Sequence, residues 1–365
     1  MEGNPKNSWQ PIVTADTTMT NYWLNWRVLL CAIWVLITTF VASFLIWKFE
    51  ASRNSKHESA ETRQETAGLL YEDEVWRPCL KHIHPAWLLA FRVFAFVVLL
   101  VLLNVTAAVD GGGIFYYYTQ WTFTLVTIYF GLGSLLSMYG CYRYHNRVGG
   151  DRVDNVALDA EQGTNVTPTH VENSNMSNIV KCLGSPEEHH VRQTAGIWGY
   201  AFQIIFQMNA GAVMLTDCVF WFIIVPFLTI KDYDLNFLII NMHTINAVFL
   251  LGDTALNCLR FPWFRIAYFF LWTVVYVIFQ WIVHACVSLW WPYPFLDLSS
   301  PYAPLWYAIL NHYLLNMSKN RSCIMSTMGT FVPMPFLMFL PDVLLIFLVT
   351  PDVGRNGCAG THRWH

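Results

Sequence analysis

Six long apolar stretches recur along this chain of 365 residues, and they limit its fold more than any other feature. They lie near 29–47, 86–107, 114–139, 203–229, 235–256 and 264–290. A helix needs roughly 17–25 apolar residues to cross a bilayer, and each stretch meets that requirement. A weaker stretch at 303–317 and a proline-broken one at 328–350 follow them. The sequence therefore predicts an all-α, polytopic transmembrane helical bundle of six spans, plus one or two weaker C-terminal ones.

Composition supports the membrane interpretation over a soluble one. The chain is 55% hydrophobic and only 12% charged, whereas a soluble domain would carry about 25% charged residues. The net charge of −3 gives no indication of a nucleic-acid partner. The N-terminus lacks a basic region followed by an apolar region and a cleavage site, so we expect the first span to insert uncleaved.

Lysine and arginine predict the orientation, because these residues favour the cytoplasmic side of short loops. The connection 48–85 carries six of them and 140–202 carries five, whereas 104–115 and 291–302 carry none. The predicted segments are an extracytoplasmic N-terminus (1–28), a span (29–47), a flexible cytoplasmic loop (48–85), two spans (86–139), a second flexible cytoplasmic loop (140–202), three spans (203–290) and a C-terminal membrane segment and tail (291–365). Arg92 lies near the cytoplasmic end of its span, where we expect its side chain to snorkel to the membrane surface. The membrane itself, plasma membrane or endomembrane, stays open.

Polar residues inside the spans are the candidates for function. The fifth stretch reads NFLIINMHTINAVFLLGD (236–253) and places His243 within an apolar run. Helical spacing aligns His243 with Asn246 and Asp253, which predicts a polar seam facing the bundle interior. The fourth span carries Gln203, Gln207 and Asp217, and the sixth carries Gln280 and His284. An imidazole in hydrocarbon is costly unless it is paired or functional, and the residues alone leave both interpretations open.

Depth within the membrane allows one comparison between spans. Thr119 lies about 7 Å and His243 about 12 Å from the extracytoplasmic ends of their spans, at 1.5 Å per helical residue. A hydroxyl and an imidazole at comparable depth are compatible with a nucleophile–base pair. Asp253 lies about 15 Å further along the helix from His243. We expect Asp253 to act through packing rather than by orienting the imidazole.

Three stretches resemble the androgen-induced and androgen-dependent intramembrane threonine hydrolases and the related rolling-stone proteins. They are YYYTQWTFTLVTIYFG (116–131), NMHTINAVFLLGDTALNCLRFP (241–262) and WPYPFL (291–296). The resemblance covers roughly 86–140 and 200–307. Asp253 stands where the family has a glutamate, and the N-terminal span and long loops are closer to the rolling-stone branch. Beyond about Tyr307 the chain does not continue the pattern.

The resemblance implies a function and a site. It implies an integral-membrane hydrolase of lipid esters, with fatty-acid esters of hydroxy fatty acids as the substrate class. Thr119 would be the nucleophile and His243 the base, with no cofactor or metal. The histidine-containing segments HIH (82–84) and EEHH (187–190) lack further ligands at matched spacing.

A non-catalytic membrane protein is the alternative: a scaffold, a fusion factor or a small-solute transporter. Its polar interior would then serve packing or passage rather than chemistry. Whether the protein is an enzyme and which oligomeric state it adopts are therefore left open by the sequence.

Overall fold

The computed structural model describes residues 15–56, 69–80, 82–161, 193–221, 225 and 237–309. Within these ranges the chain is helical, and two isolated bridges, Tyr71–Thr194 and Pro78–Asn257, take the place of any sheet. Six helical segments are long and apolar enough to cross a membrane: Trp26–Glu50, Pro85–Asp110, Tyr118–Asn146, Ile197–Val219, Leu238–Leu256 and Trp263–Cys286. The predicted all-α polytopic bundle is confirmed, and the protein is an integral, multi-pass membrane protein.

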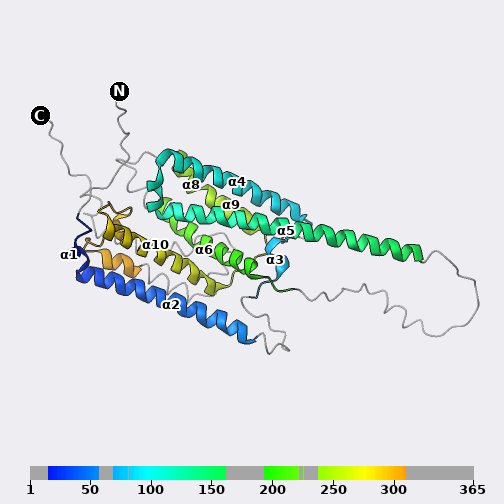
Figure 1. The fold of residues 1–365 in the computed structure, drawn as a ribbon, viewed down its shortest axis with the longest axis horizontal. Helices are drawn as coiled ribbons and strands as arrows, with labels where there is room; N and C mark the ends of the chain where they lie inside the picture. The colour runs from blue at the N-terminus through cyan, green and yellow to red at the C-terminus, as the bar shows by residue number, and fades with distance from the viewer. Residues whose placement is uncertain are drawn as a thin grey trace, which may run out of the picture.

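The long helices form one bundle (Figure 1). They are α2 (Trp26–Lys56), α4 (Pro85–Asp110), α5 (Tyr118–Glu161), α6 (Ile197–Val219), α9 (Ile245–Leu256) and α10 (Ile266–Cys286), with α8 (Phe237–Met242) directly before α9. The shorter elements are α1 (Thr20–Trp23), η2 (Gly112–Tyr116), α3 (Glu72–Trp76), η4 (Trp263–Arg265) and η5 (Pro294–Leu296). Along the bundle α4 packs on α5, α5 on α6, α6 on α10 and α10 on α2, while α9 contacts α4, α5 and α6.

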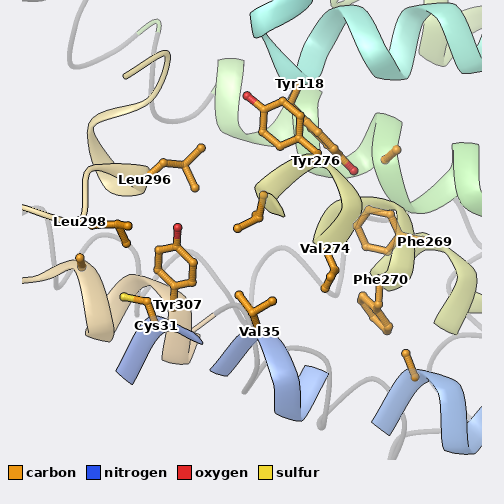
Figure 2. Packing of buried hydrophobic residues seen from close by; sticks show 14 of the residues in the cluster. Cys31, Val35, Tyr118, Phe269, Phe270, Val274, Tyr276, Leu296, Leu298 and Tyr307 are labelled. Carbon is orange, nitrogen blue, oxygen red and sulfur yellow. The ribbon is translucent and has the colours of Figure 1, made fainter. Parts of the chain in front are cut away.

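Two apolar clusters hold these helices together. One joins α2 and α10 to the segment after α10, and Figure 2 shows Cys31 and Val35 of α2 facing Tyr307. In the same view the ring of Tyr118 lies beside that of Tyr276, with a centroid distance of 4.9 Å. The other cluster joins α4, α5, α6 and α9. Packing of apolar faces and small residues, rather than water exclusion alone, holds helices together in lipid.

The two ends of the bundle differ, and we name them after the elements that lie there. The η2 end carries the turn between α4 and α5, and the α3 end carries α3 and the opposite helix termini. The segment before α2 folds onto the η2 end, where Thr17 donates a hydrogen bond of 2.7 Å to the carbonyl of His284. Tyr22 also donates to Asp297 there, at 3.0 Å. The lysine and arginine pattern places the η2 end outside, which stays a prediction.

Part of each predicted loop is helical. Helix α5 runs on to Glu161, well past the expected boundary at 139, and α3 forms within the expected loop 48–85. Packing accounts for the position of α3: a Cβ on Gly140 would lie 2.2 Å from the Trp76 ring, so glycine lets α3 dock against α5. An ion pair between Glu72 and Arg143 joins the same two helices. Residues 57–68 and 162–192 lie outside the described ranges.

The C-terminal segment is described only at its start. Residues 303–309 are helical, which is the beginning of the predicted weak span at 303–317. The rest of that stretch, the proline-broken stretch at 328–350 and the tail lie outside the described residues.

Candidate functional site

The fifth span is broken at His243. Helix α8 ends at Met242 and α9 begins at Ile245, with Thr244 at φ −120° and ψ −47°. Two carbonyls near the break are taken up by side chains. Asn246 Nδ2 donates to the Met242 carbonyl at 2.7 Å, and Trp221 Nε1 donates to the His243 carbonyl at 3.2 Å. Non-helical backbone within a membrane must be paired inside the protein, and these bonds satisfy two of the carbonyls beside the break.

His243 is buried beside an acidic residue of the neighbouring span. Its Nδ1 lies 3.3 Å from Oδ1 of Asp217, and the two side chains are 7% and 14% exposed. The imidazole stacks on Phe220 with a centroid distance of 3.8 Å and an interplanar angle of 4°. Because a carboxylate accepts hydrogen bonds, a hydrogen bond in this pair requires the proton to be on Nδ1 of the imidazole. The geometry is that of an imidazole oriented by a carboxylate.

Sequence reasoning noted Asp217 on the polar side of the fourth span but did not pair it with His243. The sequence did contain one indication, the free-energy cost of an unpaired carboxylate in hydrocarbon. Asp217 is the sole acidic residue of 203–229 and therefore needs a partner from another span. Among the ionisable groups of the neighbouring span, His243 lies at the matching end. A search for mutual partners could therefore have suggested the pair.

Thr119 lies in the first turn of α5, half-buried. Its Oγ1 is 3.5 Å from Oη of Tyr293, and the next residue, Gln120, places Nε2 2.8 Å from Sδ of Met242. Thr119 and Gln120 therefore contact both of the other stretches that carry the family resemblance, 291–296 and 241–262. The described residues include no hydrogen bond between Thr119 and His243. The predicted pairing of these two side chains stays a prediction.

Several buried polar atoms near this site have no hydrogen-bond partner among the described residues. They include Gln120 Oε1, Asn246 Oδ1 and Asp217 Oδ2. Further along α5 and α6 the same holds for Thr124 Oγ1, Asn209 Oδ1 and both amide atoms of Gln207. A buried polar atom is costly unless a hydrogen bond compensates for its lost hydration. This part of the bundle therefore has polar capacity that its own side chains do not use.

The acidic residue at the other end of α9 has a different environment. Asp253 accepts a hydrogen bond of 2.7 Å from Arg92 Nε, one of 2.6 Å from Asn257, and another from the Tyr129 hydroxyl. Arg92 also donates to the carbonyl of Val75 at 2.9 Å.

These contacts correct two expectations. The Arg92 side chain does not snorkel, because it is wholly buried in an ion pair. Asp253 does not act through packing alone, because it neutralises that buried charge.

Gln203 and His284, two further polar residues of the spans, bond to backbone carbonyls. Gln203 Nε2 donates to the carbonyl of Arg260 at 2.7 Å, and His284 Nδ1 lies 2.7 Å from the carbonyl of Gln280. The imidazole of His284 also stacks on Trp291 at 3.7 Å. Within the part of the chain that the structure describes, no group of three or more His, Cys, Asp or Glu side chains could hold a metal ion. That part includes His82 and His84, whereas EEHH (187–190) lies outside it.

The structure thus gathers Thr119, Gln120, Asp217, His243 and Tyr293 at the η2 end, and it leaves Asp253 at the α3 end.

Comparison of the chain with models of protein families, with curated proteins and with solved structures gives no match.

Proposed function

We propose that this protein is an integral-membrane hydrolase that cleaves lipid esters at the η2 end of its bundle. The observation that carries the proposal is the Asp217–His243 pair at the break in the fifth span, with Gln120 against Met242 and Thr119 next to Gln120. Thr119 is the nucleophile and His243 the base. Fatty-acid esters of hydroxy fatty acids are the substrate class that the sequence resemblance suggests. A lipid ester already partitions into the bilayer where these residues lie.

The chemistry follows the logic of a nucleophile, a base and an orienting carboxylate. Asp217 accepts a hydrogen bond from Nδ1 and holds the imidazole in the tautomer that has its lone pair on Nε2. That nitrogen takes the proton from Thr119 as Oγ1 bonds to the ester carbonyl carbon. The alcohol then leaves with the proton from the imidazolium, and water hydrolyses the acyl-threonine that remains.

The start of α9 offers electrostatic help for this reaction. Thr244 provides no side-chain cap, so the amides of Ile245, Asn246 and Ala247 are available in the first turn. The N-terminus of a helix carries a partial positive charge. Because His243 precedes this turn directly, the partial positive charge of the helix N-terminus would stabilise an oxyanion that forms beside His243.

The proposal requires Thr119 to turn from Tyr293 toward His243. The contact between Thr119 Oγ1 and Tyr293 Oη is at the long limit for a hydrogen bond, at 3.5 Å, and therefore weak. Catalytic hydrogen bonds are often long or unformed without substrate and tighten when it binds. A change of the Thr119 rotamer is the smallest movement that could bring the hydroxyl nearer.

One observation favours a second candidate, passage of a small polar solute. Transporters bind their substrates at discontinuous helices, where backbone and polar groups line the path. The break at His243–Thr244 and the unpartnered amides of α5 and α6 are features of that kind. The hydrolase explains the same break together with the oriented imidazole, and it therefore leads.

An active-site fluorophosphonate probe tests the hydrolase directly. We expect the probe to attach covalently to Thr119 in the full-length protein, located by mass spectrometry, and to be lost in Thr119→Ala and His243→Ala. Thr122→Ala is a matched control, because Thr122 lies one turn along α5 and returns its hydroxyl to the Tyr118 carbonyl at 3.1 Å. Lipid-ester hydrolysis that persists at full rate in Thr119→Ala would reject the proposal.

A further inference from the structure

We infer that the break between α8 and α9 binds an ordered water molecule between Gln120, Asn246 and the first turn of α9. Its catalytic role, as the water that hydrolyses the acyl-enzyme, rests on the function proposed above. Its presence does not rest on that function. The two statements are therefore tested separately.

Two side-chain amides contact Met242 at the end of α8, one at its sulfur and the other at its carbonyl. Gln120 Nε2 lies 2.8 Å from Sδ of Met242, and Asn246 Nδ2 lies 2.7 Å from the carbonyl of the same residue. Gln120 is 3% exposed and Asn246 1% exposed. The carbonyl contact fixes the orientation of the Asn246 amide, since a carbonyl accepts only from the NH₂ group. Both side-chain oxygens are thereby left as acceptors, and neither has a partner among the described residues.

Donors come from the first turn of α9. The earliest backbone amide of this helix that bonds back across the break is that of Val248, which donates to the Thr244 carbonyl at 3.1 Å. The three amides before it, those of Ile245, Asn246 and Ala247, belong to the first turn, whose amides have no intrahelical partner. Thr244 supplies no side-chain cap to them. The break therefore combines buried acceptors with backbone donors.

This combination selects the ligand. An anion would suit the helix N-terminus but would meet the acceptor oxygens of Gln120 and Asn246. A cation would suit those oxygens but would lie against the partial positive charge of α9. A small molecule that both donates and accepts satisfies the two sets at once. Buried waters do this, typically with about three hydrogen bonds to groups that would otherwise be unpaired.

The same water has a use in the proposed reaction. His243 Nε2 takes one proton from the water, and the water oxygen bonds to the acyl carbon held on Thr119. The bond between that carbon and Thr119 Oγ1 then breaks, and Oγ1 takes the proton from the imidazolium. The products are a free carboxylic acid and the free threonine hydroxyl, so the atoms of one water molecule are fully accounted for.

Radiolytic footprinting of the full-length protein in lipid nanodiscs tests the water site. X-ray irradiation converts a bound water into a hydroxyl radical in place, and the nearby sulfur of Met242 would gain one oxygen, as read by mass spectrometry. Met242 is buried, so we expect it to be oxidised faster than Met214, which lies exposed on the membrane span α6. If Met242 is oxidised no faster than Met214, the inferred water site is overturned, whatever the esterase activity of the protein.

A variant assigns the water to its proposed partners. Gln120→Leu removes one acceptor and sacrifices only a weak contact with sulfur, and we expect it to slow Met242 oxidation to the rate of Met214. Thr122→Val is the matched control on the same helix and should leave the rate unchanged. Unaltered oxidation in Gln120→Leu would remove Gln120 from the site and overturn the assignment. If Met242 is oxidised while Thr119→Ala still hydrolyses ester, the water site stands and the proposed function fails.

Discussion

Asp253 and Asp217 each pair with a basic side chain inside the bundle, and they differ in how completely their hydrogen bonds are made. Asp253 accepts from Arg92, Tyr129 and Asn257, and Arg92 donates in addition to Val75 and Ser137. Asp217 meets His243 at 3.3 Å, and its Oδ2 has no partner among the described residues. The same kinds of groups therefore make a closed network at the α3 end and an open one at the η2 end.

The free-energy cost of burying a charge explains why the two pairs differ in role. A buried ion pair is tolerated when further hydrogen bonds satisfy both partners, and the loss of one partner then leaves an uncompensated charge. The Arg92–Asp253 pair meets that condition and holds α4, α5 and α9 together. The contact with His243 does not complete the hydrogen bonds of the Asp217 carboxylate, because Oδ2 has no partner among the described residues. Completed pairs build this fold, and the incomplete pair lies where we propose the site.

The largest effect should come from opening the closed network. Asp253→Asn keeps the shape but leaves the buried Arg92 charge uncompensated, which costs about 3–5 kcal/mol in pairs of this kind. We expect a large fall in the thermal unfolding midpoint, measured by tryptophan fluorescence in detergent, and poor recovery of monodisperse protein. Equal destabilisation by Asp217→Asn would show that the two pairs do not differ in the way described.

Removal of the imidazole should produce the largest loss of activity with little loss of fold. We expect His243→Ala and Thr119→Ala each to reduce lipid-ester turnover by at least about 10³-fold, and the double variant to lose no more than either alone, because residues that act as a unit are not additive. Initial rates on a lipid ester in nanodiscs provide the measurement. A double variant with multiplied losses would show that the two residues act independently.

Much of the architecture could be predicted from the sequence because its signal is local. Length and hydropathy define the six spans without reference to other parts of the chain. The Arg92–Asp253 pair could not be predicted in the same way, since 161 positions separate the two residues. Arg92 near the end of a span fits snorkelling as well as burial, and only the packing of α4 against α9 decides between them.

The break in the fifth span at His243 also could not be predicted from the sequence. The residues Asn241, Met242, His243 and Thr244 include neither glycine nor proline, so no ordinary helix breaker indicates it. It is held by Asn246 and by Trp221, whose contact depends on how α6 ends beside α8. Depth showed Thr119 and His243 to be compatible with a pair, and the family resemblance named them as candidates. Identification of Asp217 as the partner of His243 required the register of α6 against α8, which the sequence does not give.

A subtler change should test the open pair. Asp217→Asn preserves the volume but removes the charge that orients the imidazole, and the equivalent change in serine hydrolases costs about 10⁴ in turnover. Here we expect a loss of about 10²–10⁴, with the unfolding midpoint close to that of the wild type. Asp217→Glu should recover part of the rate. Full activity in Asp217→Asn would show that Asp217 only packs against His243. The proposed contrast between a structural Asp253 and a functional Asp217 would then fail.

The smallest effect should come from an ion pair that lies at the α3 end but is not buried. Glu72 and Arg143 join α3 to α5 with side chains 28% and 27% exposed. Because solvent screens such a pair, exposed examples contribute only about 0.2–1 kcal/mol. We therefore expect Glu72→Gln to shift the unfolding midpoint slightly, to become less distinguishable from wild type at high salt, and to leave ester turnover unchanged. A double-mutant cycle with Arg143→Gln measures the coupling energy of the pair. If that energy is comparable with the coupling of Arg92 and Asp253, the strength of these pairs is set by their position at the α3 end. Burial and completed hydrogen bonding would then not be the cause.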